Sequence, residues 1–117
     1  MNIDELSPAL LVAGYAKRTK KRFGQHFLTD PSILDRIVSH AGVADGDAVL
    51  EIGPGPGTLT IQLIKAGARV TAVEIDDDAA AYLERQFGEN LSLHHGDVLS
   101  MDVGEVLSAG VLSLIHI

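Results

Sequence analysis

The stretch that decides the fold is "VLEIGPGPGTLT", residues Val49 to Thr60. It begins as a short apolar strand pattern and continues into three glycines, Gly53, Gly55 and Gly57, that alternate with prolines. Glycine lets the backbone approach a ligand with no Cβ in between, and proline stiffens a turn by fixing φ. The pattern predicts a rigid turn between a buried strand and a helix, placed to contact a ligand.

The rest of the sequence continues this alternation of strands and helices. Before the turn, "TDPSILDRIVSHAG" predicts a helix that is capped by Thr29 or Asp30, has Pro31 in its first turn and stops at Gly42. After it, "TLTIQLIKAG" and "DDDAAAYLERQFGE" are typical of helices, while "ARVTAVEID", "LSLHHGD" and "VLSLIHI" are typical of strands. "MDVGEVLSAG" has room for a helical turn or two. This order predicts an α/β fold, a parallel sheet with helices on both faces.

Composition limits the class of protein. The chain has 117 residues, is 46% hydrophobic and contains no cysteine, so we expect one small globular domain without disulfides or thiolate chemistry. Its apolar runs are shorter than the roughly 18 residues that a membrane span needs. We expect a cytoplasmic protein with no membrane partner.

The charge is unevenly distributed. The net charge is −7, yet five of the nine basic residues lie close together near the N-terminus. They are Lys17, Arg18, Lys20, Lys21 and Arg22. An acidic body with a basic segment predicts a polyanionic partner that binds the basic side. The alternative is that the basic segment is only a solvated tail. We expect residues 1–22 to be a flexible basic arm.

Acidic residues follow the predicted strands. Glu51 precedes the glycine turn, Glu74 ends the second strand, and Asp97 follows the third. A carboxylate at the end of the second strand is placed to accept hydrogen bonds from ribose hydroxyls, and Asp97 or its neighbours are placed to meet an adenine amine. Thr58 stands where a G-x-G-x-x-G dinucleotide motif has its third glycine. Taken singly, the glycines could form only a tight turn, Glu74 could be a helix cap and Asp97 a loop acid. Taken together, these features resemble those of S-adenosylmethionine-dependent methyltransferases.

Four segments carry a closer resemblance: "KKRFGQHFLTD", "LEIGPGPGTLT", "AVEID" and "GDVL". With them the chain resembles the ribosomal RNA adenine dimethyltransferases, the small-subunit methyltransferase A family, over about residues 17–103. The resemblance implies a Rossmann-like methyltransferase fold. Residues 23–117 would then be a partial methyltransferase domain that is truncated after about the fourth strand, without the family's C-terminal helical domain.

The resemblance also implies which residues bind S-adenosylmethionine. They are His26, Leu28, Gly53, Gly55, Gly57, Glu74, Asp97 and Val98. In this assignment Gly53 contacts the methionine part, Glu74 holds the ribose hydroxyls, and Asp97 with Val98 recognises the adenine. His26 and Leu28 cover the ligand, which would occupy one hollow shared by all these groups.

The implied reaction is dimethylation of N6 of two adjacent adenosines near the 3′ end of small-subunit rRNA, within a pre-30S particle. The basic residues would bind RNA phosphates, and a monomer is expected. The family's catalytic motif, Asn-Leu-Pro followed by Tyr or Phe, is absent, and "VLSLIHI" stands where it would begin. We therefore name no catalytic residue and expect weak or no activity from this chain alone.

Three other functions are compatible with parts of the sequence. Thr58 and "KKRFGQHFL" argue against a nicotinamide-dependent oxidoreductase. A methyltransferase of small molecules would have no need of the basic cluster. A non-catalytic rRNA-binding assembly factor is favoured by the missing motif. His94 and His95 are adjacent on a strand and point to opposite faces, so they predict no metal site.

Overall fold

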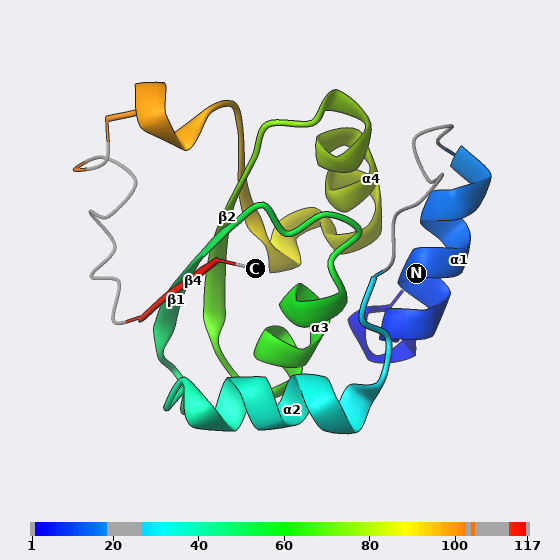
Figure 1. The fold of residues 1–117 in the computed structure, drawn as a ribbon, viewed down its shortest axis with the longest axis vertical. Coiled ribbons are helices and arrows are strands. Elements are labelled where there is room, and N and C mark those ends of the chain that lie inside the picture. Colours follow the sequence, from blue (N-terminus) through cyan, green and yellow to red (C-terminus); the bar gives the residue numbers. More distant parts are fainter. Residues whose placement is uncertain (1, 19–26, 103, 105–112, 117) are drawn as a thin grey trace.

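The computed structural model describes residues 2–18, 27–102, 104 and 113–116. Their elements include four α-helices and four strands, with short 3-10 turns between some of them (Figure 1). In chain order they are η1 (Ile3–Glu5), α1 (Pro8–Arg18), α2 (Pro31–His40), β1 (Ala48–Ile52), α3 (Thr58–Lys65), β2 (Arg69–Glu74), α4 (Asp77–Phe87), η2 (Gly88–Asn90), β3 (Ser92–His95), η3 (Val98–Ser100) and β4 (Ser113–His116).

The strands form one parallel sheet in the order β3-β2-β1-β4. Ile52 of β1 is in register with Val73 of β2, and Glu74 of β2 is in register with His95 of β3. The carboxyl ends of these strands therefore meet at one edge of the sheet. The predicted parallel α/β architecture and its four strands are confirmed. Helices on both faces were also predicted, whereas the four α-helices α1 to α4 that the structure describes all pack into the core on one face.

The sheet separates two apolar clusters. Val49 and Val70 point into the main core, which contains side chains from α1, α2, α3 and α4. Helix α3 is central to it, because it contacts α1, α2 and β2 (Figure 1). Side chains alternate along a strand, so neighbouring strand residues face the other way. Leu50 and Val73 form the second cluster there, with Ile52, Val98 and Met101 packed against them.

Helix α2 begins and ends where its sequence predicts. The Asp30 carboxylate accepts a hydrogen bond from the backbone N–H of Ser32 at 2.9 Å, and Pro31 occupies the first helical position. Gly42 follows the helix with a φ of 73°. Among the described residues, no helix is long and apolar enough to cross a membrane. Of the helical turns predicted in "MDVGEVLSAG", residues 103 and 105–110 lie outside the described part of the chain.

The N-terminal region differs from the predicted flexible arm. Residues 8–18 form α1, whose Leu11 and Tyr15 lie one turn apart and are 1% and 4% exposed. The Tyr82 hydroxyl of α4 donates a hydrogen bond to the Leu11 carbonyl at 2.7 Å. The prediction was wrong for this segment, because the apolar residues that precede the basic cluster form a stripe that packs into the core. Residues 19–22 of the predicted arm lie outside the described residues.

Candidate functional site

The glycine turn connects β1 to α3 as the sequence predicts. Gly53, Gly55 and Gly57 have φ angles of 71°, 59° and 93°, a region that side chains with a Cβ rarely adopt. A Cβ built on Gly53 would meet no atom within 4 Å, so this part of the turn borders open space. A Cβ on Gly55 would lie 3.5 Å from the Phe27 ring, which is ordinary contact.

Gly57 has a different environment. It caps the start of α3 and is buried, and a Cβ there would lie 2.6 Å from Cε2 of Phe87 and 3.1 Å from Leu83. Both neighbours belong to α4. Gly57 therefore allows α3 to pack closely on α4 and does not line the open side of the turn.

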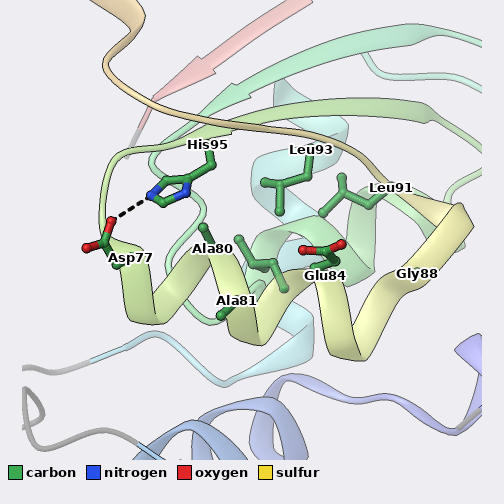
Figure 2. A pocket seen from close by; sticks show the side chains of 9 residues that line it. Asp77, Ala80, Ala81, Glu84, Gly88, Leu91, Leu93 and His95 are labelled. Atoms are coloured by element: carbon green, nitrogen blue, oxygen red, sulfur yellow. Dashed lines mark hydrogen bonds and ion pairs between the residues drawn. The ribbon is translucent and has the colours of Figure 1, made fainter.

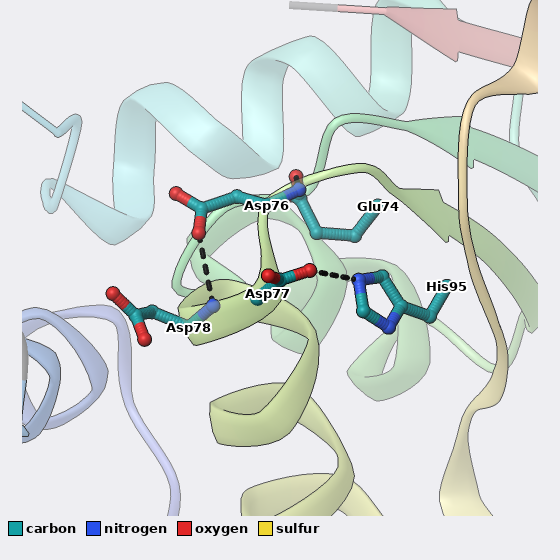
Figure 3. A network of polar contacts seen from close by, with 5 residues as sticks. All are labelled: Glu74, Asp76, Asp77, Asp78 and His95. Atoms are coloured by element: carbon teal, nitrogen blue, oxygen red, sulfur yellow. Dashed lines mark hydrogen bonds and ion pairs between the residues drawn. The ribbon is translucent and has the colours of Figure 1, made fainter.

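Glu74 ties the turn to the next strand. Its Oε1 accepts a hydrogen bond from the backbone N–H of Gly55 at 2.9 Å, and its Oε2 accepts one from the N–H of Asp76 at 3.0 Å. The residue is 5% exposed. Figure 3 shows Glu74 beside the first residues of α4, where the Asp76 carboxylate in turn accepts from the N–H of Asp78 at 2.9 Å.

The ends of β1, β2 and β3 lie side by side. The N–H of Gly53 donates to the Val73 carbonyl, and the N–H of Gly96 donates to the Glu74 carbonyl, both at 2.9 Å. The segments that carry Gly53, Glu74 and Asp97 are consequently neighbours at one edge, in the predicted order. Asp97 is exposed and caps η3: its carboxylate accepts a hydrogen bond from the N–H of Leu99.

A cavity of about 290 Å³ opens beside the turn. Leu28, Gly53 and Gly55 line it, together with Glu51 and Thr58.

The other predicted site residues that the structure describes lie outside this lining. Glu74 reaches the region through its hydrogen bond to Gly55, while Asp97 follows the end of the third strand. Val98 packs against the second apolar cluster. His26 lies outside the described residues. The structure thus brings three of the eight into one cavity and places Glu74 next to it.

Glu51 also lines the cavity, and no role was predicted for it. It is 4% exposed, and the Thr60 hydroxyl donates a hydrogen bond to its Oε1 at 2.5 Å. Burial raises the pKa of Glu51 to about 7; the Thr60 hydrogen bond opposes this shift and the nearby Glu74 adds to it. An acid inside an otherwise apolar strand was the available signal, since buried carboxylates at such positions often serve a ligand.

A second cavity, of about 410 Å³, lies between α4 and the edge strand β3 (Figure 2). It is lined by residues such as Ala80 and Leu93, and at its end His95 Nε2 lies 2.8 Å from Asp77 Oδ1. None of the predicted cofactor residues that the structure describes lines it. We place the candidate site at the smaller cavity, because ligands of parallel sheets bind beyond the carboxyl ends of the strands.

The basic cluster is only partly described. Lys17 and Arg18 end α1, while Lys20, Lys21 and Arg22 lie outside the described residues. Within the part of the chain that the structure describes, no three His, Asp or Glu side chains are grouped closely enough to hold a metal ion.

Known proteins resemble this chain in sequence. A family described as ribosomal RNA adenine dimethylase matches residues 16–114. The ribosomal RNA small subunit methyltransferase A of Gloeobacter violaceus is 57% identical over 83 residues, which are 69% of this chain and 30% of that protein. The same-named protein of a Synechococcus strain is 50% identical over 95 residues, 79% of this chain and 34% of that protein. The chain spans about a third of the length of these relatives.

Solved structures resemble it in fold. An RNA methyltransferase of Salinibacter ruber, in complex with S-adenosyl-L-homocysteine, has a TM-score of 0.57 and 26% identity over 68% of this chain and 56% of its own. A dimethyladenosine transferase of Plasmodium falciparum has a TM-score of 0.55 and 34% identity over 65% of this chain and 29% of its own. The predicted Rossmann-like methyltransferase fold is thereby confirmed, and with residues 16–114 matched, the chain belongs to the ribosomal RNA adenine dimethylase family.

Proposed function

We propose that this chain forms the S-adenosylmethionine-binding part of an rRNA adenine-N6,N6-dimethyltransferase. Its substrate would be two adjacent adenosines near the 3′ end of small-subunit rRNA, in a cytoplasmic pre-30S particle. The observation that carries the proposal is the hydrogen bond from Gly55 to Glu74, which joins the glycine turn to an acid at the next strand end. Membership of the family and its fold supports the same function.

The residues present fit such a cofactor. Gly53 borders open space, so backbone and ligand can approach there without a side chain between them. Both oxygens of Glu74 are held by backbone N–H groups, and each retains a lone pair that can accept a ribose hydroxyl. Leu28 supplies an apolar wall and is 40% exposed. Asp97 stays exposed one strand further along, where an adenine would extend.

When bound, the cofactor supplies a methyl group on a sulfonium, which is a good leaving group. This chain's task is then to hold that methyl in line with an incoming nucleophile, since alignment supplies much of the rate in such reactions. The target adenine must leave its stack to reach the methyl. The Asn-Leu-Pro-aromatic motif that would orient the adenine amine is not in these 117 residues. We therefore propose weak or no methyl transfer by the chain on its own.

The basic cluster of residues 17–22 would bind RNA phosphates. Binding of this kind weakens steeply with salt, because each neutralised phosphate releases counterions. An rRNA-binding assembly factor without catalysis is the second candidate, and the absent motif is what favours it.

Calorimetry with the 117-residue chain tests cofactor binding. We expect S-adenosylmethionine to bind and NAD not to bind, and we expect Glu74→Ala to abolish binding while Glu89→Ala, an exposed matched control, retains it. Binding of NAD in preference to S-adenosylmethionine would contradict the proposal.

The RNA function needs a second experiment. Filter binding with small-subunit rRNA, with and without cofactor, should show salt-dependent binding, and radiolabelled methyl incorporation should be at or near background. Robust dimethylation by the purified chain would contradict the proposal that the absent motif is needed to orient the adenine amine.

A further inference from the structure

Strand β3 has one long side without a neighbouring strand. It lies at the end of the sheet order, and no other strand of the described part of the chain pairs with its outer side. The N–H of Gly96 donates to the Glu74 carbonyl of β2. Because backbone groups alternate in direction along a strand, Leu93 and His95 direct their N–H and C=O groups away from β2. Each of these two residues therefore presents a donor and an acceptor at the open edge.

The same edge borders the cavity of about 410 Å³ between β3 and α4. Leu93 and His95 line this cavity with side chains that point from β3 toward α4 (Figure 2). From the opposite wall, α4 presents the small Ala81 between two acids, Asp77 and Glu84. Exposed edges are usually blocked by charges, bulges or a covering element, whereas here a small side chain leaves a hollow beside the open strand. We call this feature the β3–α4 groove.

The groove is acidic. Asp77 and Glu84 are exposed and seven positions apart on α4, so they lie on one face of the helix and about 10 Å apart along its axis. The titratable group that faces them from β3 is His95, whose Nε2 lies 2.8 Å from Asp77 Oδ1, and no Lys or Arg is part of the described lining. Residues 30–117 contain fourteen acidic and four basic residues. A field of this sign attracts cations and repels phosphates.

We propose that the β3–α4 groove binds an extended basic segment of a partner protein, which adds to the sheet as a strand beside β3. The backbone of the segment would pair with Leu93 and His95. Side chains on one face of a strand recur at every second residue, so positions four apart are separated by about 13 Å. Two Lys or Arg residues at such positions can reach Asp77 and Glu84 through their flexible stems, and the residue between them faces Ala81 and the hollow.

A protein fits this groove better than RNA does. Phosphates would meet Asp77 and Glu84, whereas a polypeptide supplies both cations and strand hydrogen bonds. Basic segments are common in proteins that bind nucleic acid, so a second protein on the same RNA is the kind of partner we expect. Among the described residues, the groove and the cavity beside the glycine turn share no lining residue. The proposed function therefore stands whether or not this groove binds a partner.

Nuclear magnetic resonance of the 117-residue chain with a synthetic peptide tests the groove. The probe is the capped peptide Thr-Lys-Thr-Val-Thr-Lys-Thr, in which both Lys side chains and Val share one face when the peptide is extended. It should shift the amide signals of Leu93, His95 and Glu84, less so at high salt. The matched peptide with Glu in place of Lys should bind about tenfold more weakly, because two exposed ion pairs become like-charge pairs. Unchanged signals at millimolar probe would overturn the proposal.

Two N-methylated forms of the probe separate strand addition from simple charge attraction. In each form every second backbone N–H carries a methyl group, and the two forms methylate alternate sets of residues. Only one set of N–H groups can face β3 in an added strand. One form should therefore lose binding while the other keeps it. Equal binding of both forms would overturn the pairing with β3.

Variants of the chain test the groove from the other side. Ala81→Leu places a good helix former at an exposed position, so the fold should remain while the hollow is filled and binding of the probe is lost. Glu84→Gln keeps the shape without the charge and should bind about threefold more weakly. The matched control is Glu5→Gln, exposed in η1 and outside the groove, which should bind as the parent chain does. Binding by Ala81→Leu at the parent's affinity would show that the probe sits elsewhere.

A second copy of the chain is the competing occupant, since open edges can pair with each other. Sedimentation equilibrium of the chain without peptide should show a monomer over the concentrations used for the resonance experiment. A dimer that forms with rising concentration, and that Ala81→Leu prevents, would assign the groove to self-association and overturn the basic partner.

Discussion

The backbone N–H of Gly55 donates a hydrogen bond to Oε1 of Glu74 across 2.9 Å. The two residues are 19 positions apart, one in the turn after β1 and the other at the end of β2. The second oxygen of the same carboxylate accepts from the N–H of Asp76, the residue that caps α4. One acidic side chain therefore fixes both the turn beside the cavity and the start of the next helix.

Replacing Glu74 by Ala should destabilise the fold as well as prevent binding. The change leaves the N–H groups of Gly55 and Asp76 without their partner, and a buried donor left unpaired costs about 1–3 kcal/mol. Both donors are part-buried, so we expect a total loss near the lower end of about 1–3 kcal/mol. Urea unfolding measures it, and Glu89→Ala at an exposed site serves as the control. Equal stability of the two variants would contradict this role of Glu74.

Gly57→Ala should destabilise the protein more strongly. The new methyl group would lie 2.6 Å from Phe87 Cε2, and overpacking of this kind costs about 1–3 kcal/mol. The φ of 93° adds backbone strain of about 1–3 kcal/mol. We expect a loss of about 2–6 kcal/mol in the free energy of unfolding, the rough sum of these two effects, measured by urea denaturation.

The matched control for this variant is Gly42→Ala. Gly42 has a comparable φ of 73°, but a Cβ there would meet nothing within 4 Å. Only the strain contribution remains, so this variant should lose about 1–3 kcal/mol. If both variants lose the same free energy, the close packing of Gly57 on α4 does not contribute.

The sequence predicted most of the elements because their signals are local. Asp30 with Pro31 starts α2, and the glycine turn after "VLEI" separates β1 from α3, since caps and turns depend on residues close in sequence. Alternating strands and helices fixed the parallel sheet through general rules of connection. These features required no knowledge of tertiary contacts.

The sequence could not predict what depends on packing between distant segments. The Tyr82 hydroxyl of α4 donates a hydrogen bond to the carbonyl of Leu11, 71 residues away. This contact ties α1 to the core, whereas composition suggested that the segment was a tail. Gly57 and Gly53 look alike in the sequence, yet one packs against Phe87 and the other borders open space. The position of Glu51 in an apolar strand hinted at burial, but its hydrogen bond with Thr60 and its place in the cavity depend on the packing of α3 and the turn.

Leu11→Ala tests whether α1 belongs to the cooperative core. Leu11 is 1% exposed, and truncation of a buried leucine to alanine costs about 2–5 kcal/mol. The neighbouring Leu10 is 55% exposed, so Leu10→Ala should change the stability by less than about 0.5 kcal/mol. Thermal or urea unfolding of both variants measures the difference. A negligible effect of Leu11→Ala would show that the segment does not contribute to the folded state.

Glu51 makes the stability of the ligand-free protein depend on pH in an unusual direction. Burial raises its pKa from 4.5 to about 7 in the folded state. Between these values the unfolded chain has lost the proton and the folded chain retains it. The folded state therefore binds more protons, and this group's contribution to stability falls as the pH rises from about 4.5 to 7 and is constant above that range.

Glu51→Gln should remove this dependence, because the amide does not ionise. At pH 4.5 the variant and the parent chain should differ little. At pH 7.5 the variant should be more stable, by up to about 3 kcal/mol, since each unit of pKa difference corresponds to about 1.4 kcal/mol. Urea unfolding of both chains across this range measures the difference, which isolates Glu51 from other carboxyl groups. Glu89→Gln, exposed in η2, should follow the parent at every pH. Parallel curves for Glu51→Gln and the parent would mean that Glu51 ionises in the folded chain as it does in the unfolded one.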